Sequence, residues 1–173
     1  WVFGYSAFRG GQEGLIDAQL QGRDAFGIMP TGGGKSLCYQ IPALLLEGVT
    51  LVISPLISLM RDQVMALKNA GVAAAYINSS LTPAQIRLVY RNIQSGMYKI
   101  IYVAPERLLT DGFLEAIQAR KVSLVTVDEA HCISQWGQDF RPSYLKIVDF
   151  LNILTPRPVV SAFTAPASET GRQ

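Results

Sequence analysis

Short apolar runs recur along the chain, and helix-like segments separate them. Strands are predicted at Ala25–Met29, Thr50–Ser54, Ala73–Asn78, Lys99–Ala104, Val122–Val127 and Val159–Thr164. Several of these runs are apolar almost throughout, as expected of strands that are covered on both faces. Because strands that alternate with helices form parallel sheets, we expect an α/β domain with a mostly parallel sheet and helices on both faces.

The segments between the strands have helical patterns. Helices are predicted at Gly11–Gln21, Ser36–Leu46, Leu56–Asn69, Pro83–Ser95, Gly112–Ala119 and Tyr144–Leu154. Thr82, Pro83 and Gln85 have the order of an N-cap, a first-turn proline and a capping box. Gly71 and Gly96 are placed to end two of the helices.

Length and composition restrict the class of protein. The chain has 173 residues, which suits one domain with an adequate core, and its apolar stretches are too short to span a bilayer. Cys38 and Cys132 are far apart, and His131 is the only histidine, which disfavours zinc and favours reduced thiols over a disulfide. The net charge of +2 does not by itself indicate nucleic acid. Since the chain starts at Trp1, we expect the natural N-terminus to lie upstream.

A glycine-rich segment follows the first predicted strand. Positions 29–36 are Met-Pro-Thr-Gly-Gly-Gly-Lys-Ser, which departs from the GxxxxGK[ST] phosphate-loop pattern only at Met29. The loop backbone and the next helix N-terminus can bind phosphate, Lys35 can reach the β and γ phosphates of ATP, and Ser36 can ligate Mg²⁺. The predicted contacts are Thr31, Gly32, Gly33, Gly34, Lys35 and Ser36. The alternative, a turn with a solvated lysine, is disfavoured by the strand before and the helix after.

Two acids follow the predicted strand Val122–Val127. The carboxyl ends of parallel strands meet at one edge of a sheet, so Asp128 and Glu129 should lie near the phosphate loop. Asp128 can hold Mg²⁺ through water, and Glu129 can act as general base, with Lys35 as the other catalytic residue. The alternative is that the acids cap a turn. Thr164 ends the last strand at the same edge and could sense the nucleotide or only end a strand.

The sequence resembles the RecQ family of superfamily 2 helicases over nearly its whole length. The matching blocks are Phe3–Gln12 (motif 0), Met29–Gln40 (I), Val52–Val64 (Ia), Tyr102–Leu108 (Ib), Asp128–Tyr144 (II) and Ser161–Ala167 (III). The tract Ser134–Tyr144 is the most specific, because other DEAD/DEAH helicases lack this aromatic-rich loop.

The resemblance implies an ATP-dependent 3′→5′ DNA helicase that couples ATP hydrolysis to unwinding, with roles in DNA repair and recombination. Residues 1–173 would be its first RecA-like lobe, ending just after motif III. ATP and Mg²⁺ would be the cofactors, single-stranded and duplex DNA the partners, and the cytoplasm (the bacterial nucleoid) or a eukaryotic nucleus the location, the cytoplasm being favoured. A second lobe would supply the arginine finger, so we expect this lobe alone to be inactive as a motor.

The resemblance also assigns residues at the base of the nucleotide. It implies that Tyr5 stacks on adenine and that Arg9 and Gln12 complete the base pocket, for which the amide of Gln12 can both donate and accept. The alternative for the aromatics near this end is core packing, which we favour for Phe3 and Phe8.

A second implied group would contact DNA and couple it to hydrolysis. Its members are Trp136, Gln138, Phe140, Arg141 and Thr164. Aromatic side chains stack on bases of any sequence, and arginine adds phosphate contact, whereas the alternative is a buried aromatic cluster. Two positions depart from the family: Gln138 replaces the usual histidine, and Pro166 replaces a threonine and removes a backbone donor.

The sequence leaves two rival functions open. One is another superfamily 2 motor, such as a DEAD/DEAH RNA helicase, against which the aromatic tract argues. The other is a nucleotide- or DNA-binding module that no longer hydrolyses ATP. The presence of Lys35, Ser36, Asp128 and Glu129 argues against that loss.

Overall fold

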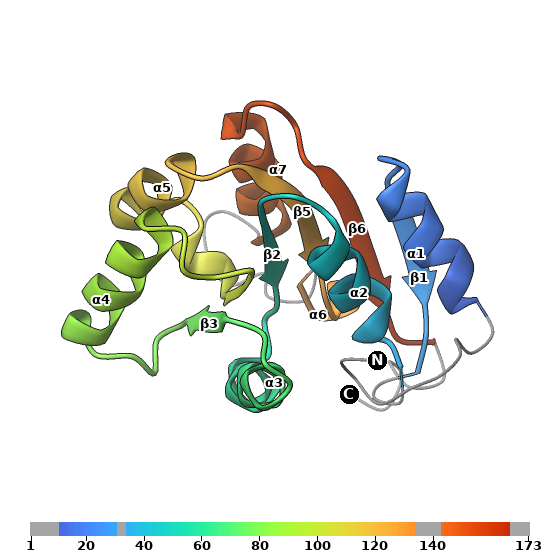
Figure 1. The fold of residues 1–173 in the computed structure, drawn as a ribbon, viewed down its shortest axis with the longest axis horizontal. Helices are drawn as coiled ribbons and strands as arrows, with labels where there is room; N and C mark the ends of the chain where they lie inside the picture. Colours follow the sequence, from blue (N-terminus) through green and yellow to red (C-terminus); the bar gives the residue numbers. More distant parts are fainter. Residues whose placement is uncertain (1–10, 31–33, 134–142, 167–173) are drawn as a thin grey trace.

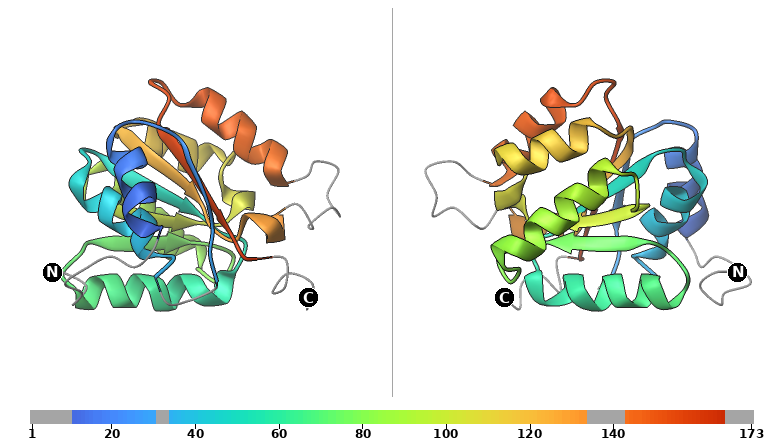
Figure 2. Two further views of the ribbon diagram at one scale, coloured as in Figure 1. Left: turned by 90° about the vertical axis from the view of Figure 1, so that its right-hand side faces the viewer. Right: turned by 60° about the vertical axis from the view of Figure 1, so that its left-hand side comes forward.

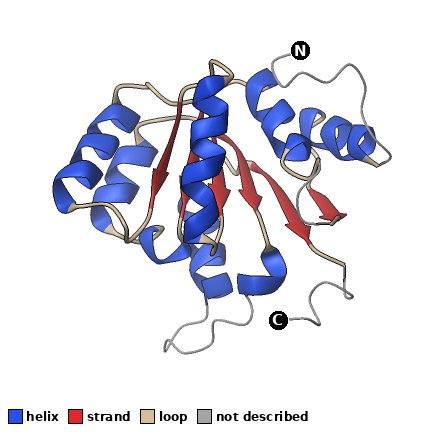
Figure 3. Ribbon diagram, turned by 90° about the horizontal axis from the view of Figure 1, so that it is seen from below, coloured by secondary structure: helices blue, strands red, loops and turns tan. Residues whose placement is uncertain are grey.

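The central feature of the fold is a six-stranded sheet in which every strand runs parallel to its neighbours. The computed structural model describes residues 11–30, 34–133 and 143–166. The order across the sheet is β1-β6-β5-β2-β4-β3, and the arrows point the same way in Figure 3. The strands are β1 (Ala25–Ile28), β2 (Val49–Ile53), β3 (Ala74–Ile77), β4 (Ile100–Val103), β5 (Val122–Val127) and β6 (Val159–Thr164).

Helices cover both faces of the sheet, as expected (Figure 1). They are α1 (Gln12–Leu20), α2 (Leu37–Leu45), α3 (Ile57–Asn69), α4 (Pro83–Gln94), the 3₁₀ turn η1 (Pro105–Arg107), α5 (Asp111–Gln118), α6 (Ala130–Ile133) and α7 (Ser143–Ile153). Buried residues of α2 and α3 form one core with the sheet, and those of α4, α5 and α7 form the other. Figure 2 shows these two layers from the side. In the part of the chain that the structure describes, no helix is long and apolar enough to cross a membrane.

The predicted elements agree with the structure to within one residue at each end, and the α/β prediction is confirmed. Thr82 forms the predicted capping box with Gln85: its Oγ1 accepts from the Gln85 N–H at 3.2 Å, and Gln85 Oε1 accepts from the Thr82 N–H at 2.8 Å. Gly71 and Gly96 follow helix ends with φ of 85° and 80°. The sequence patterns did not predict the short elements η1 and α6.

Helix α2, which directly follows the phosphate loop, contains a proline in its interior. Pro42 has no N–H, so the carbonyl of Cys38 one turn earlier loses its usual helical donor. The buried side chain of Gln19 on α1 supplies one, because its Nε2 donates to the Cys38 carbonyl at 2.7 Å and to the Leu15 carbonyl at 2.8 Å. This contact fastens α1 to α2.

This geometry predicts that the effect of replacing Gln19 depends on Pro42. Gln19→Met keeps the side-chain length but leaves the buried Cys38 carbonyl without its donor, and should cost about 1–3 kcal/mol of unfolding free energy. In a Pro42→Ala background the backbone N–H gained at position 42 can bond that carbonyl, so the same replacement should cost less. Urea unfolding of the four variants measures the coupling. Equal costs in both backgrounds would contradict the assignment.

Candidate active site

Those predicted site residues that the structure describes converge at the carboxyl edge of the sheet, where β1, β5 and β6 end. Sheet pairing continues into the site: the Met29 N–H donates to the Thr164 carbonyl at 2.9 Å, and the Asp128 N–H donates to the Ile53 carbonyl at 2.8 Å. Met29 at the start of the phosphate loop, the first residue of the acidic pair and the end of the last strand are therefore joined to the sheet by backbone hydrogen bonds.

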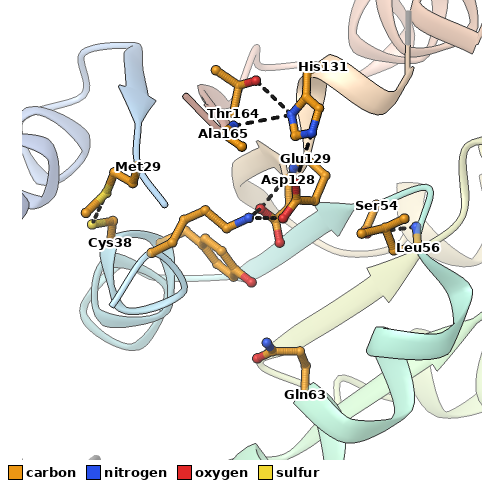
Figure 4. Close-up of polar contacts among 12 residues, drawn as sticks. Met29, Cys38, Ser54, Leu56, Gln63, Asp128, Glu129, His131, Thr164 and Ala165 are labelled. Atoms are coloured by element: carbon orange, nitrogen blue, oxygen red, sulfur yellow. Dashed lines mark hydrogen bonds and ion pairs between the residues drawn. The ribbon is translucent and has the colours of Figure 1, made fainter. Parts of the chain in front are cut away.

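Lys35 lies between the two acids. Its ammonium is 3.0 Å from Asp128 Oδ1 and is hydrogen-bonded to Glu129 Oε1, and all three side chains are buried. Figure 4 shows Asp128 and Glu129 pointing to the same place from the end of β5. The sequence predicted this juxtaposition of residues more than ninety positions apart.

The burial of this cluster sets its proton affinities. Burial by itself lowers the pKa of Lys35, but the charges of Asp128 and Glu129 and their hydrogen bonds outweigh it, and the pKa is raised. Burial raises the pKa of Asp128, and Lys35 opposes this rise. The cluster contains two carboxyl groups and one ammonium. Because acidic groups outnumber basic ones, the cluster is suited to a divalent cation.

The oxygens at this edge fit Mg²⁺ together with a nucleotide. Mg²⁺ is usually bound through one or two protein oxygens, with phosphate and water completing its octahedron. Asp128 and the partly exposed Ser36 lie with Lys35 and Glu129 around one small pocket, so both can face the same ion. The donor set is thus consistent with the predicted cofactors.

Glu129 has an uncommon backbone conformation for a residue with a side chain. Its φ is 52°, in the left-handed region, which costs about 1–3 kcal/mol unless the surroundings hold it. Its N–H donates to Asp128 Oδ1 at 3.0 Å, which stabilises the turn from β5 into α6. The turn brings the carboxylate to the Lys35 ammonium. The sequence patterns gave no sign of this conformation.

His131 connects the acidic motif to the end of β6. Its Nδ1 is 2.8 Å from Thr164 Oγ1 and accepts from the Ala165 N–H at 3.3 Å, while its Nε2 lies 3.4 Å from Glu129 Oε2 (Figure 4). Because the Ala165 N–H can only donate, Nδ1 is the accepting nitrogen and Nε2 carries the proton toward Glu129. Thr164 thus reaches Glu129 through His131, a link that sequence reasoning did not assign.

Gln12, predicted for the base pocket, contacts the phosphate loop. It is buried, and its Nε2 donates to the Gly34 carbonyl at 2.8 Å. Gly34 has φ of 153°, and a Cβ there would lie 2.4 Å from Gln12 Nε2, so a glycine is needed for this close approach. A contact between Gln12 and adenine stays a prediction.

Several predicted site residues lie outside the described part of the chain. They are Tyr5, Arg9, Thr31, Gly32, Gly33, Trp136, Gln138, Phe140 and Arg141. The described ones that meet at the edge are Gln12, Gly34, Lys35, Ser36, Asp128, Glu129 and Thr164. Ser161, also in the motif III block, is buried and bonds Thr126 on β5 at 2.8 Å, so it joins two strands.

A polar cluster beneath the site was not predicted. The Tyr39 and Tyr102 hydroxyls are 3.0 Å apart, and Gln40 Nε2 donates to the Tyr102 hydroxyl at 3.0 Å. Burial, the neighbouring Tyr102 hydroxyl and the charge of Asp128 together raise the pKa of Tyr39. Burial raises the pKa of Tyr102 to about 12. The polar pair Tyr39-Gln40 in an otherwise apolar helix was the sequence signal that could have found it.

The fold and this site define a class of protein. The model of the DEAD/DEAH box helicase family matches residues 9–172, and the chain belongs to that family. Among curated relatives, it is 53% identical over 172 residues to the ATP-dependent DNA helicase RecQ of Pasteurella multocida, and 53% identical over 167 residues to that of Bacillus subtilis. These alignments cover 99% and 96% of this chain but only 27% and 28% of the relatives. The resemblance to RecQ is thereby confirmed.

Solved structures share the fold. A hypothetical ATP-dependent RNA helicase from Sulfolobus tokodaii is 25% identical, with a TM-score of 0.74 over 94% of this chain and 47% of its own. The helicase MrfA bound to DNA and AMPPNP is 18% identical, with a TM-score of 0.76 over 94% of this chain and 24% of its own. The second likeness concerns the fold alone.

Cys38 lies under the phosphate loop, and its reactivity tests the local packing. The thiol is fully buried, with Sγ 3.6 Å from the Gly34 carbonyl, and burial raises its pKa to about 11. At pH values below the ordinary thiol pKa, the thiolate fraction is about a hundredfold lower than for a free thiol. In a Cys132→Ser variant, we expect iodoacetamide to modify Cys38 at least that much more slowly at pH 8 in the folded chain than in urea.

The pH dependence of the modification rate tests whether the pKa of Cys38 is raised. In the folded chain the rate should still rise between pH 8 and 10, because the thiol stays protonated below its raised pKa. A folded-state rate that levels off near pH 9, or that equals the rate in urea, would contradict the buried position.

Proposed function

We propose that the chain is the ATP-binding lobe of an ATP-dependent DNA helicase that unwinds DNA with 3′→5′ polarity. The observation that carries the proposal is the contact of Lys35 with Asp128 and Glu129 at the strand ends. The 53% identity to RecQ helicases supports DNA as the substrate. Because the chain spans about 27% of such a relative, the second lobe and its arginine finger belong to the proposal, as does a cytoplasmic (nucleoid) location.

Each residue at the edge has a proposed task. Lys35 binds the β and γ phosphates, Ser36 and Asp128 hold Mg²⁺, and Glu129 orients and deprotonates the attacking water. When bound, Mg²⁺ neutralises charge on the phosphates. Residues Thr31, Gly32, Gly33 and Gly34 cradle the phosphates, while Tyr5, Arg9 and Gln12 hold the adenine.

The proposed DNA contacts lie in the tract after α6. Trp136, Phe140 and Arg141 would stack on bases and contact phosphate, with Gln138 beside them. Thr164 would take part in coupling, since its hydroxyl reaches His131 and His131 reaches Glu129. MrfA, which shares this fold over part of its chain, has been solved with DNA and AMPPNP bound.

The role of Lys35 is tested by nucleotide titration. Lys35→Ala removes a charge-assisted contact to phosphate, so Mg-ADP and Mg-ATP should bind roughly ten- to a hundredfold more weakly than to the wild type. Lys121→Ala, which removes an exposed lysine paired with Glu47, is the control and should bind normally. Thermal unfolding of each variant checks that the fold is intact. Equal affinity of Lys35→Ala and the wild type would remove Lys35 from the site.

The aromatic tract is tested in a full-length helicase that carries this lobe. Trp136→Ala and Arg141→Ala should reduce ATPase activity stimulated by single-stranded DNA more than basal ATPase, because they remove DNA contacts and leave the nucleotide site. A stacking loss is worth about 1–3 kcal/mol per base. If both activities fall together, the residues are structural. Stimulation by RNA that equals stimulation by DNA would favour the RNA-helicase alternative.

The dependence on a second lobe is tested by steady-state turnover. The 173-residue chain should bind Mg-ATP but hydrolyse it at least ~10³-fold more slowly than a two-lobe protein with saturating single-stranded DNA, because an arginine finger contributes ~10³–10⁵ in rate. It should also fail to unwind DNA, since unwinding needs two lobes that open and close. Comparable turnover in both proteins would refute this dependence.

A further inference from the structure

Strand β1 is at one edge of the sheet (Figure 1), and it leaves two large apolar side chains in water. Phe26 and Ile28 are 61% and 63% exposed. Because they are two residues apart on a strand, both side chains point to the same face of the sheet. Their partners on β6, Ala162 and Thr164, are only half-buried. We call the surface that these four residues form the open face.

The other face of β1 is closely packed. Gly27 lies between the two exposed residues and is directed to that face, where a Cβ would lie 2.9 Å from the ring of Phe163 and 3.1 Å from Leu15 on α1. Phe163 belongs to the core that α2 and α3 form with the sheet. Strand β1 is therefore covered on one face and uncovered on the other.

The helices on the second face pack against the other four strands. Among the described residues, the core that α4, α5 and α7 form contains residues of β2, β3, β4 and β5 but none of β1 or β6. Single exposed apolar side chains are common on proteins. Here two of them are neighbours on an all-parallel sheet, and such sheets are normally covered on both faces. The second layer of helices therefore lacks a member over β1 and β6.

The direction of the existing crossovers predicts where a further helix would lie. From β1 to β2 to β3 the chain moves across the sheet one way, and α2 and α3 lie on the closely packed face. From β3 to β4, β5 and β6 it moves back, and α4, α5 and α7 lie on the second face. Right-handed crossovers require this match of direction and face. A strand added in parallel at the free edge of β1 continues the return direction, so its crossover helix would lie on the open face.

We propose that the open face is the docking surface for an amphipathic helix that follows Gln173 in the longer protein, and that a strand after this helix pairs with β1. The relatives are long enough for such a segment, because the alignments cover only 27% and 28% of them. Strand β6 ends beside the open face, since Thr164 pairs with Ile28 and its carbonyl accepts from the Met29 N–H at 2.9 Å. A short connection from β6 can therefore reach the open face.

The docked helix braces the two strands that lead into the candidate site. Strand β1 leads directly to Met29 and the phosphate loop, and β6 ends at Thr164, whose hydroxyl bonds His131. Phe26 and Ile28 supply apolar contacts to the helix, which needs apolar residues about every three to four positions on the side that faces them. This docking does not depend on whether the site binds a nucleotide.

Photocrosslinking in the full-length protein identifies what covers the open face. Phe26→p-benzoylphenylalanine keeps an aromatic ring at this position and, when irradiated, reacts with C–H bonds of the chain that lies against it. We expect a crosslink within about 40 residues after Gln173, because a strand–helix–strand unit takes roughly 30 residues or more. Leu88→p-benzoylphenylalanine is the matched control: Leu88 is 51% exposed on α4, on the other side of the molecule (Figure 1), and should give no crosslink to that segment.

Cysteine accessibility gives a second measurement, which decides the matter if the crosslinking variant fails to fold. In a Cys132→Ser background, iodoacetamide should modify Ile28→Cys roughly tenfold or more slowly in the full-length protein than in the 173-residue chain. Leu88→Cys should react equally fast in both proteins.

Three results would overturn the proposal. The first is a crosslink from position 26 only to the second lobe or to another copy of the protein. The second is Ile28→Cys that reacts equally fast in both proteins. The third is protection of Ile28→Cys in the 173-residue chain that increases with protein concentration, because a second copy would then cover the open face.

Discussion

The contact of Lys35 with Asp128 and Glu129 is the interaction on which the site depends. It joins the start of α2 to the end of β5, although β6 lies between β1 and β5 in the sheet. Removing such charges from water costs several kcal/mol per ion, so a buried ion pair is weak evidence for stability. A cluster of this cost at the ligand-binding edge of a parallel sheet is better explained by function.

The same charges explain how the fold can respond to a ligand. In the proposed site, phosphate oxygens and the two carboxylates would compete for the Lys35 ammonium, and Mg²⁺ would offer Asp128 a substitute for it. Glu129 also faces His131, which bonds Thr164 at the end of β6. A chain of polar contacts thus joins the partners of Lys35 to the acidic motif and to the last strand.

Much of this architecture could be predicted from the sequence, because it depends on local patterns. Apolar runs and the Thr82 cap predict the elements, and the Lys35-Ser36 and Asp128-Glu129 pairs predict which edge of the sheet carries the candidate site. What escaped prediction depends on contacts between distant segments. Gln19 donates to a carbonyl freed by Pro42, and Tyr39 meets Tyr102 from another element. No periodicity records such pairings, and the left-handed φ of Glu129 is imposed by its surroundings.

The central claim is that this charge cluster is the Mg-nucleotide site, and a crystal structure of the chain with Mg²⁺ and a non-hydrolysable ATP analogue tests it most directly. We predict that the phosphates lie against residues 31–36, that Lys35 Nζ bonds the β and γ phosphates, and that Mg²⁺ lies near Ser36 and Asp128. A nucleotide bound away from this edge would contradict it. So would a bound nucleotide whose phosphates leave Lys35 paired to both carboxylates.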